Sequence, residues 1–440
     1  MRFVFTEEMH AATKRELLSE TDLETCAVGL ARESNDRLIV HRVRIPREQD
    51  YAERRLASAQ LRPEFLFDVA AAARRENCSL IFLHTHPRDA ERPTFSKIDD
   101  AGETRLAHFL EQLMPGTLHG AIVMSPGGIS ARQLATKSEA TVFSVGRKLL
   151  VETGRSPAEP AGDFDRQVRA FGAEGQAAIA NLRVGIVGLG GTGSLTAQQL
   201  TYLGVQDFAL VDFDPVDRTS LNRLVGATPA DVGVPKVKIA ERGILTVNRV
   251  AKVRTIEGDV GDDQIARQLL DRDVIFGCTD SHASRAILGQ IAYQYLIPLI
   301  DMGVSLSVRD GMLAKITGRI QLLAPGLPCF TCLELLDSEQ IRRELLTPEQ
   351  RAADRYIQGA QEPQPSVISL NSTVSSLAVS MFLGLVTEAP LEATFQRYDG
   401  LKGLVRPVAG SIDPHCYVCA HENGLARADS WPLPTRAPRS

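Results

Sequence analysis

Short hydrophobic runs alternate with amphipathic stretches through the first 150 residues. The runs of four to nine residues that are rich in Val, Ile and Leu predict strands, and the longer stretches with an apolar face predict helices. The sequence therefore predicts a mixed α/β unit here. The expected strands are 25–31, 37–45, 78–84 and 120–125, and the expected helices are 63–75 and 96–113.

A second series of strands begins after residue 164. Predicted strands at 182–187, 208–214, 273–280 and 298–304 alternate with helical stretches. Strands separated by helices favour a parallel-rich sheet covered on both faces, as in Rossmann-like folds. We thus expect two domains, 1–152 and 164–424.

Three segments of different composition lie between the domains, within the second domain and after it. Residues 153–163 (TGRSPAEPAGD) are rich in Pro, Gly and small side chains, which is typical of a linker. Residues 337–365 are charged and contain several Gln and Pro residues, so we expect a mobile crossover segment. Residues 425–440 are expected to form a disordered tail.

The bulk composition narrows the class of protein. The chain has 440 residues and a net charge of -5, which argues against nonspecific nucleic-acid binding. Its N-terminus lacks the apolar run of a signal peptide. The apolar stretch 377–386 is shorter than a bilayer requires. We therefore expect a cytoplasmic protein with no membrane or nucleic-acid partner.

The stretch 84–99 (HTHPRDAERPTFSKID) contains a candidate zinc site. His84 and His86 at the end of a strand point to the same side, because side chains alternate along a strand. Asp99 can complete the ligand set if the following helix packs against that strand, which leaves a position for water. Considered alone, Ser96 and Asp99 are also typical of an ordinary helix cap.

This constellation resembles the JAMM (MPN-type) metalloproteases, which remove ubiquitin-like proteins from their conjugates. The resemblance implies a cytidine-deaminase-like domain with a catalytic zinc bound by His84, His86 and Asp99. It also implies that Ser96 hydrogen-bonds the oxyanion and that Glu24, in an early strand, is the general base. The alternative for Glu24 is a solvated carboxylate on an edge strand. The spacing between Pro87 and Ser96 is slightly longer than in this family.

A glycine-rich turn predicts a phosphate site in the second domain. Glycines at the start of a helix let phosphate approach backbone N–H groups, and an acid at the end of the next strand suits a ribose. Alone, this pattern would suggest NAD. Arg223, Lys236 and Asp280 instead fit a triphosphate with Mg²⁺, although each could be an ordinary solvated charge or helix cap. The glycines are Gly188, Gly190, Gly191 and Gly193, and the acid is Asp212.

Residues 165–420 as a set resemble the MoeB/ThiF and ubiquitin-activating adenylating enzymes. The resemblance implies that Asp212 and Asp214 bind the ribose of ATP, and that Asn222, Arg223 and Lys236 line the phosphate site. It further implies that Asp280 organises Mg²⁺. Arg166 would reach the ATP of the partner subunit in a homodimer. The implied reaction adenylates the C-terminal glycine of a ubiquitin-like protein.

The seven cysteines divide into two groups. Cys329/Cys332 and Cys416/Cys419 form two Cys-x-x-Cys pairs, whose spacing predicts a structural tetrathiolate zinc site. Cys26, Cys78 and Cys278 are poorly placed to accept an acyl group, and Cys278 is expected to be a buried thiol.

Ser366 occupies the position at which similar activating enzymes with an adjacent thiol carry that thiol. Either the adenylate passes directly to a separate acceptor, or Ser366 forms an oxyester. Ser366 is otherwise an ordinary loop serine.

Together these features predict a bifunctional enzyme. One half adenylates a ubiquitin-like protein, with a conjugating enzyme as a further partner, and the other half trims or deconjugates its linkages. The alternative is biosynthetic: a sulfur-carrier protein is activated and released on the way to a cysteine, thiamine or siderophore-type product. A third reading is an inactive scaffold that only binds the modifier.

Overall fold

The computed structural model describes residues 1–152, 162–347, 350, 365–390 and 392–436. The chain divides into two compact units. The first comprises Met1–Ser156, Gln294–Leu296 and Leu425–Trp431, and the second contains Pro157–Tyr293, Ile297–Gly424 and Pro432–Ser440. Each unit is mixed α/β, as the hydrophobic pattern predicted.

The first unit is built on one sheet with the strand order β1-β3-β2-β6-β7-β8-β9-β10. A further pairing of β1 with β9 closes the strands into a ring. A separate hairpin, β4–β5, has no partner strand in this sheet. The bounds are β1 Arg2–Thr6, β2 Cys26–Ser34, β3 Arg37–Arg44, β4 Tyr51–Arg55, β5 Ser58–Leu61, β6 Ser79–Thr85, β7 Gly120–Ser125, β8 Gly128–Gln133, β9 Glu139–Val145 and β10 Leu149–Glu152.

Alternation along the strands divides the core of this unit into two clusters. In β6, Ile81 and Leu83 join one cluster with helix α1, whereas Leu80 joins another with helices α2 and α3. Side chains of a strand point alternately to its two faces, so both faces of β6 are buried. Consequently the end of β6 is fixed from both sides. The helices are α1 Glu7–Leu17, η1 Glu48–Asp50, α2 Pro63–Glu76 and α3 Lys97–Leu113.

The second unit contains a sheet in the order β13-β12-β11-β14-β15-β16-β17-β18. The strands from β13 to β15 pair in parallel, and those from β15 to β18 pair antiparallel. The parallel half was predicted, but the antiparallel half was not. The bounds are β11 Arg183–Val187, β12 Asp207–Asp212, β13 Lys252–Glu257, β14 Val274–Gly277, β15 Leu299–Arg309, β16 Met312–Leu323, β17 Phe395–Asp399 and β18 Leu404–Pro407.

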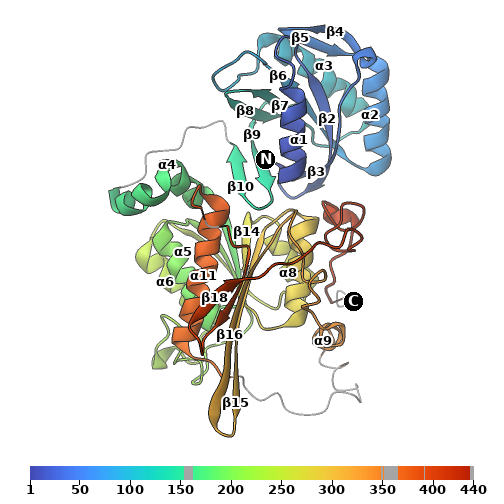
Figure 1. Cartoon of the computed structure of the whole chain (residues 1–440). Helices are drawn as coiled ribbons and strands as arrows, with labels where there is room; N and C mark the ends of the chain where they lie inside the picture. The colour runs from blue at the N-terminus through green and yellow to red at the C-terminus, as the bar shows by residue number, and fades with distance from the viewer. Residues whose placement is uncertain (153–161, 348–349, 351–364, 391, 437–440) are drawn as a thin grey trace. The chain divides into compact units, whose positions relative to one another are not determined.

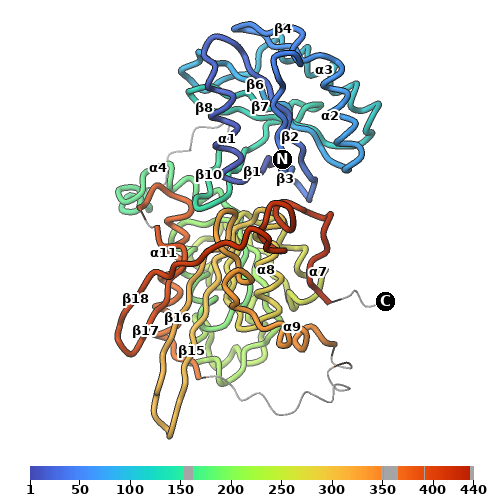
Figure 2. Tube along the Cα trace, turned by 45° about the vertical axis from the view of Figure 1, so that its right-hand side comes forward, coloured from blue at the N-terminus to red at the C-terminus, as the bar shows by residue number. Residues whose placement is uncertain are grey.

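Helices cover this second sheet. Helix α11 lies beside α5, and the β15–β16 hairpin projects beyond the other strands (Figures 1 and 2). Exposed hydrophobic residues at the hairpin tip include Met312, which is 71% exposed. The helices are η2 Gly162–Phe164, α4 Asp165–Asn181, α5 Gly191–Leu203, η3 Pro229–Asp231, α6 Lys236–Val247, α7 Asp263–Ala266, η4 Arg267–Leu269, α8 His282–Gln294, α9 Ser338–Glu344, α11 Ile368–Val386 and η5 Ala428–Ser430.

Helix α11 is longer than the apolar stretch read from the sequence. Its 19 residues are long and apolar enough to cross a membrane, and half of this stretch is buried. Val374, Ala378 and Phe382 are fully buried. Ser375 Oγ also donates a hydrogen bond to the carbonyl of Thr192 in α5. These contacts make α11 a core helix of the second unit.

The structure describes only parts of the predicted connecting segments. Only residues 162–163 of the predicted linker are described, and they begin a 3₁₀ turn. The predicted mobile crossover includes helix α9, while residues 348–349 and 351–364 lie outside the described part. The tail is ordered as far as Arg436, because Ala426, Ala428 and Leu433 are buried. The expectation of disorder for 425–436 was therefore wrong.

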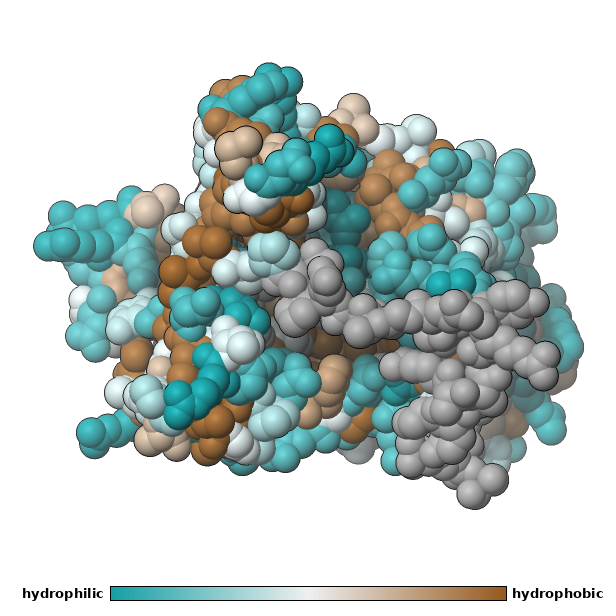
Figure 3. Space-filling view, turned by 90° about the horizontal axis from the view of Figure 1, so that it is seen from below, coloured by the Kyte–Doolittle hydropathy of each residue, from teal (hydrophilic) through white to brown (hydrophobic). Residues whose placement is uncertain are grey.

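Hydrophobic and hydrophilic residues are interspersed on the face drawn in Figure 3.

Candidate active sites

The predicted metal ligands of the first unit come together. His84 is on β6, His86 follows the end of that strand, and Asp99 is in the first turn of α3. One ligand atom from each lies within 4.8 Å of the others. His84 Nε2 is 3.3 Å from Asp99 Oδ1, and His86 Nε2 is 3.8 Å from Asp99 Oδ2. Two imidazoles and a carboxylate at these separations suit a zinc ion.

The burial of His84 Nε2 and the ionisation of the Asp99 carboxylate also suit a metal ion. His84 Nε2 is buried, and within the described residues it makes no hydrogen bond of good geometry. Burial opposes ionisation of Asp99, but the His84 ring beside it and the hydrogen bond from the Ser96 N–H hold the pKa of its carboxyl below the usual value. A buried nitrogen without a donor or acceptor is costly. A cation facing both His84 and an ionised Asp99 would remove that cost.

Ser96 has the helix-capping role that its spacing also allowed. Its Oγ accepts a hydrogen bond from the Asp99 N–H (3.2 Å), and Asp99 Oδ2 accepts one from the Ser96 N–H (2.6 Å). This reciprocal pair is a capping box. It occupies one carboxylate oxygen of Asp99 and leaves Oδ1 directed at His84.

Glu24 lies beside the metal ligands. It precedes β2 instead of lying within it, and it is 7% exposed, so the solvated edge carboxylate is not observed. Its Oε1 is 3.9 Å from His86 Nε2. Burial raises the pKa of the Glu24 carboxyl to about 7, against an opposing effect of His84. A carboxylate with that pKa is suited to accept and return protons near neutral pH.

The β4–β5 hairpin, whose role the sequence did not reveal, holds Glu24 in place. The Glu24 N–H donates to the carbonyl of Arg55 (2.8 Å). Arg54 donates from Nε to the Glu24 carbonyl (3.1 Å) and from Nη2 to Thr25 Oγ1 (2.9 Å). The hairpin thus fixes the backbone on both sides of the carboxylate. No local sequence signal connects residues 51–61 with Glu24.

In the second unit, the glycine turn joins β11 to α5 as predicted. Gly188 has φ +86°, which side-chain-bearing residues rarely adopt. A Cβ at Gly193 would lie 1.8 Å from the Gly188 carbonyl oxygen, whereas one at Gly190 would meet nothing within 4 Å. Thus Gly193 permits the tight turn, and Gly190 leaves one side of the turn open. Such a turn at a helix N-terminus is suited to bind phosphate.

Acidic residues lie at the end of β12 and just after it, next to this turn. Asp212 Oδ2 accepts from the Leu189 N–H (2.6 Å), so the carboxylate lies against the glycine turn. Burial raises the pKa of the Asp212 carboxyl, while the hydrogen bond from Leu189 opposes the rise. Asp214 Oδ2 pairs with Lys236 Nζ at 2.7 Å. The structure therefore brings both predicted ribose residues and one predicted phosphate residue to the same edge of the sheet.

The remaining predicted nucleotide residues lie at different places. Arg223 is near the start of α5, since a Cβ at Gly191 would be 3.4 Å from its Cδ. Arg223 Nη1 contacts Asn222 Oδ1 at 3.3 Å. Asp280 follows β14 at the carboxyl edge of the sheet, and its carbonyl accepts from Arg285. Arg166 is exposed on α4; its reach to a partner subunit stays a prediction.

Two side chains near α5 and α8 were missed by sequence reasoning. Asn371 of α11 is 3% exposed, and its Nδ2 donates to Ser366 Oγ (3.1 Å). Glu344 at the end of α9 accepts from Ser281 Oγ (2.6 Å) and from the Ala283 N–H (2.7 Å). It therefore caps the start of α8 directly after Asp280. Both contacts join segments that are far apart in the sequence.

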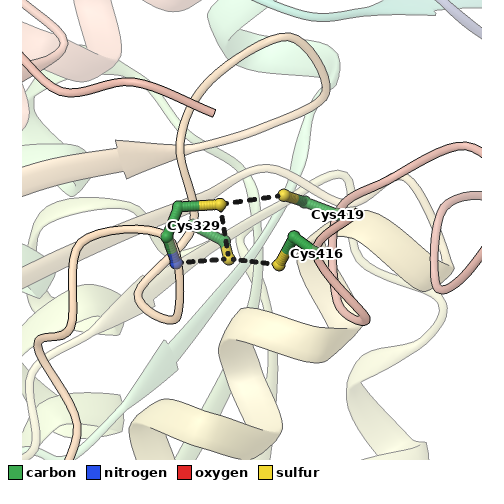
Figure 4. Close-up of side chains that lie close together, drawn as sticks. Cys329, Cys416 and Cys419 are labelled. Atoms are coloured by element: carbon green, nitrogen blue, oxygen red, sulfur yellow. Dashed lines mark hydrogen bonds between the residues drawn. The ribbon is translucent and has the colours of Figure 1, made fainter. Parts of the chain in front are cut away.

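The four cysteines of the Cys-x-x-Cys pairs form one cluster. The Sγ–Sγ distances are 3.6 Å for Cys329–Cys332, 3.5 Å for Cys329–Cys416 and 3.4 Å for Cys332–Cys419 (Figure 4). Thiolates around zinc at about 2.3 Å are separated by roughly 3.8 Å. The cluster thus has the dimensions of a structural zinc site. Cys278, in contrast, packs against Gly193, and burial raises the pKa of its thiol to about 12.

Comparison with known proteins gives matches to the second unit. Residues 164–418 match the ThiF family. Molybdopterin-synthase adenylyltransferase of Escherichia coli is 28% identical over 260 residues, covering 58% of this chain and 95% of the relative. The SAMP-activating enzyme E1 of Haloferax volcanii is 31% identical over 162 residues, covering 37% of this chain and 57% of the relative. A crystal structure of E. coli MccB with succinimide aligns with a TM-score of 0.46 at 20% identity, covering 58% of this chain and 73% of that one.

Proposed function

The chain belongs to the ThiF family, and we propose that its second unit uses ATP to adenylate the C-terminal carboxylate of a small carrier protein. A carboxylate oxygen attacks the α-phosphorus, the bond from that phosphorus to the bridging oxygen breaks, and pyrophosphate leaves. The observation that carries this proposal is the convergence of the glycine turn, Asp212 and Lys236 at one edge of the sheet. The named adenylyltransferase relative supports it.

Each residue has a defined task in this proposal. Asp212, already held by the Leu189 N–H, is placed to bind the ribose hydroxyls. The backbone N–H groups at the start of α5 bind phosphate oxygens, and Arg223 and Lys236 supply positive charge beside them. Asp280 would hold Mg²⁺, which neutralises charge on the phosphates. Catalysis then consists of positioning and charge stabilisation of the reacting groups.

We place the biosynthetic reading ahead of the conjugation reading. One relative, which the chain covers over 95% of its length, is named molybdopterin-synthase adenylyltransferase, and this name supports the biosynthetic hypothesis. The carrier is then a sulfur-carrier protein with a C-terminal glycine. The conjugation hypothesis, with a ubiquitin-like modifier and a conjugating enzyme as partners, stays second; the relative named SAMP-activating enzyme E1 supports it.

ATP–pyrophosphate exchange tests the activation step. The purified chain is mixed with ATP, labelled pyrophosphate and a candidate carrier ending in glycine, with a carrier lacking that glycine as the control. Exchange that requires the glycine supports the proposal. Incubating the activated carrier with sulfide or with a conjugating enzyme then separates the two readings. No exchange with any glycine-ended carrier, despite intact folding, would support a binding scaffold instead.

We further propose that the first unit is a JAMM-type zinc hydrolase that cleaves the linkage at the carrier's C-terminus. The specific observation is the meeting of His84, His86 and Asp99 with the buried Glu24. These three ligands would hold zinc, which lowers the pKa of a bound water. Glu24 is placed to take a proton from that water and pass it to the leaving amine, as water adds across the cleaved C–N bond.

Ser96 retains a proton-donating hydroxyl in this scheme. Its oxygen accepts from the Asp99 N–H, so its own O–H is available for the oxyanion of the substrate. Hydrolysis of a carrier fused to a C-terminal peptide tests the site. Asp99→Asn should abolish cleavage, whereas pyrophosphate exchange should continue at the wild-type rate. Unchanged cleavage by Asp99→Asn would exclude this assignment.

We also propose that the four clustered cysteines would hold a structural zinc, that a homodimer would bring Arg166 to the partner's ATP, and that the protein acts in the cytoplasm. For Ser366, we favour direct delivery of the adenylate over an oxyester, because its Oγ accepts the amide N–H of Asn371. Mass spectrometry of Ser366→Ala with ATP and carrier tests this choice, since a covalent adduct that Ser366→Ala loses would establish the oxyester.

A further inference from the structure

A buried amide lies against the first residue of the phosphate-binding helix. A Cβ added to Gly191, where α5 begins, would come 2.2 Å from Asn371 Nδ2 and 3.4 Å from Arg223 Cδ. The Asn371 amide and the Arg223 side chain therefore flank the same backbone position. Asn371 comes from α11, about 180 residues later in the sequence than Gly191.

The orientation of this amide is fixed by its neighbours. Asn371 Nδ2 donates to Ser366 Oγ at 3.1 Å. One turn later in α11, Ser375 Oγ donates to the Thr192 carbonyl at 2.9 Å, which sets α11 in register with α5. Asn371 is 3% exposed, so few rotamers are open to it. The amide is consequently held in place before any ligand arrives.

An amide nitrogen carries two N–H donors, and Ser366 uses one of them. A buried polar group is costly unless its donors are used. The neighbouring backbone N–H groups at the start of α5 are donors as well, and the helix dipole there favours negative charge. An anionic oxygen is the partner that all these donors share.

We propose that Asn371 binds a phosphate oxygen of ATP, with Ser366 acting as the residue that orients its amide. This inference rests on the proposed nucleotide site. Asn371 and Ser366 then form a polar pair that adds a neutral donor to the charged contacts of Arg223 and Lys236. Ser366 serves the nucleotide site through Asn371.

Equilibrium binding of ATP·Mg²⁺ and of adenosine to the full-length chain, measured by calorimetry, tests the proposal. A lost hydrogen bond to a charged group weakens binding about tenfold or more. Asn371→Ala should therefore bind ATP about tenfold more weakly and adenosine equally well. Asn371→Asp has nearly the same shape but places a carboxylate at the phosphate, so it should lose more ATP affinity than Asn371→Ala.

The same experiment separates a phosphate contact from a structural role. Ser376→Ala, an exposed position on the same helix, is the matched control and should bind ATP like the wild type. The inference would be overturned if Asn371→Asp bound ATP with an affinity within twofold of the wild type. It would also be overturned if the variants lost affinity for adenosine and for ATP equally. If the wild-type chain itself fails to bind ATP, the proposed nucleotide site is wrong, and this inference with it.

Discussion

The Glu344 carboxylate accepts a hydrogen bond of 2.6 Å from Ser281 Oγ, although 63 residues separate them. The same oxygen accepts from the Ala283 N–H, so Glu344 caps α8 directly behind Asp280. Arg436 in turn donates to the Glu344 carbonyl (3.0 Å) and pairs with Asp259 (2.7 Å). Glu344 at the end of α9 thus links two other parts of the chain. It contacts the start of α8 next to Asp280, the predicted Mg²⁺ ligand, and it contacts Arg436 in the C-terminal segment.

Replacing Glu344 should affect both stability and activation. Glu344→Ala leaves two donors at the start of α8 without their acceptor, which costs about 1–2 kcal/mol of unfolding free energy. We also expect slower pyrophosphate exchange, because the backbone after Asp280 loses its anchor. Glu344→Gln keeps an acceptor oxygen and should lie between wild type and Glu344→Ala. Wild-type exchange and stability in Glu344→Ala would contradict this role.

The two metal sites should respond to mutation separately. The two ligand sets imply two zinc equivalents per chain. His84→Ala should reduce zinc to one equivalent, as measured by atomic emission, with little change in pyrophosphate exchange. Retention of both equivalents in His84→Ala would show that the paired imidazoles do not bind metal.

Disrupting the thiolate cluster should instead destabilise the second unit. Cys416→Ser removes one ligand of the proposed structural zinc, which would contribute several kcal/mol to folding. We expect a thermal midpoint lowered by roughly ten degrees or more and one zinc equivalent fewer. Cys278→Ser, at a thiol outside the cluster, is the control for zinc content. An unchanged midpoint in Cys416→Ser would exclude a structural zinc.

The acid stability of the chain should depend on His119. Burial lowers the pKa of this imidazole from 6.5 to about 4, and its Nδ1 accepts from the Leu80 N–H (3.0 Å). Between those pH values the unfolded chain binds a proton that the folded chain does not. The free energy of unfolding therefore falls as pH decreases from 6.5 to 4, and the loss ends below about 4, amounting to at most about 3 kcal/mol.

His119→Asn is the matched variant, because its side-chain oxygen can accept from Leu80 in the same place. Urea unfolding at several pH values should show a smaller loss of stability in His119→Asn than in the wild type. His41, whose pKa is also lowered to about 4, contributes a similar loss that remains in the variant. Identical pH profiles for the two proteins would mean that His119 is protonated in the folded state.

The contact between Gly191 and Asn371 predicts a coupled pair of mutations. Gly191→Ala forces its methyl group into the Asn371 amide and should weaken ATP binding strongly. Asn371→Ala removes the obstructing atoms, so the double variant should bind better than the sum of the two losses predicts. ATP affinity of the four proteins measures this coupling. Simple additivity would mean that α11 moves away at no cost.

The elements of this fold are largely visible in the sequence. Strands β2, β3, β6, β7, β12 and β14 and helices α2 and α3 follow from local periodicity, because burial on one or both faces fixes which positions are apolar. The antiparallel half of the second sheet does not follow. The pairing direction of β15 and β16 depends on the chain connection between them, which the hydrophobic pattern does not record.

For the candidate sites, too, the sequence predicted one part and only the tertiary structure decided the other. Spacing picked out His84, His86 and Asp99, the glycine turn and the four clustered cysteines as candidates, since each set needs particular residue types at short intervals. Only tertiary structure decided that the β4–β5 hairpin holds Glu24, that Glu344 caps α8 and that Asn371 meets Gly191. The physical reason is that these contacts join segments distant in the chain, where a hydrogen bond between side chain and backbone imposes no periodic pattern. The candidate site residues were therefore readable in the sequence, whereas the contacts that hold them in place required the fold.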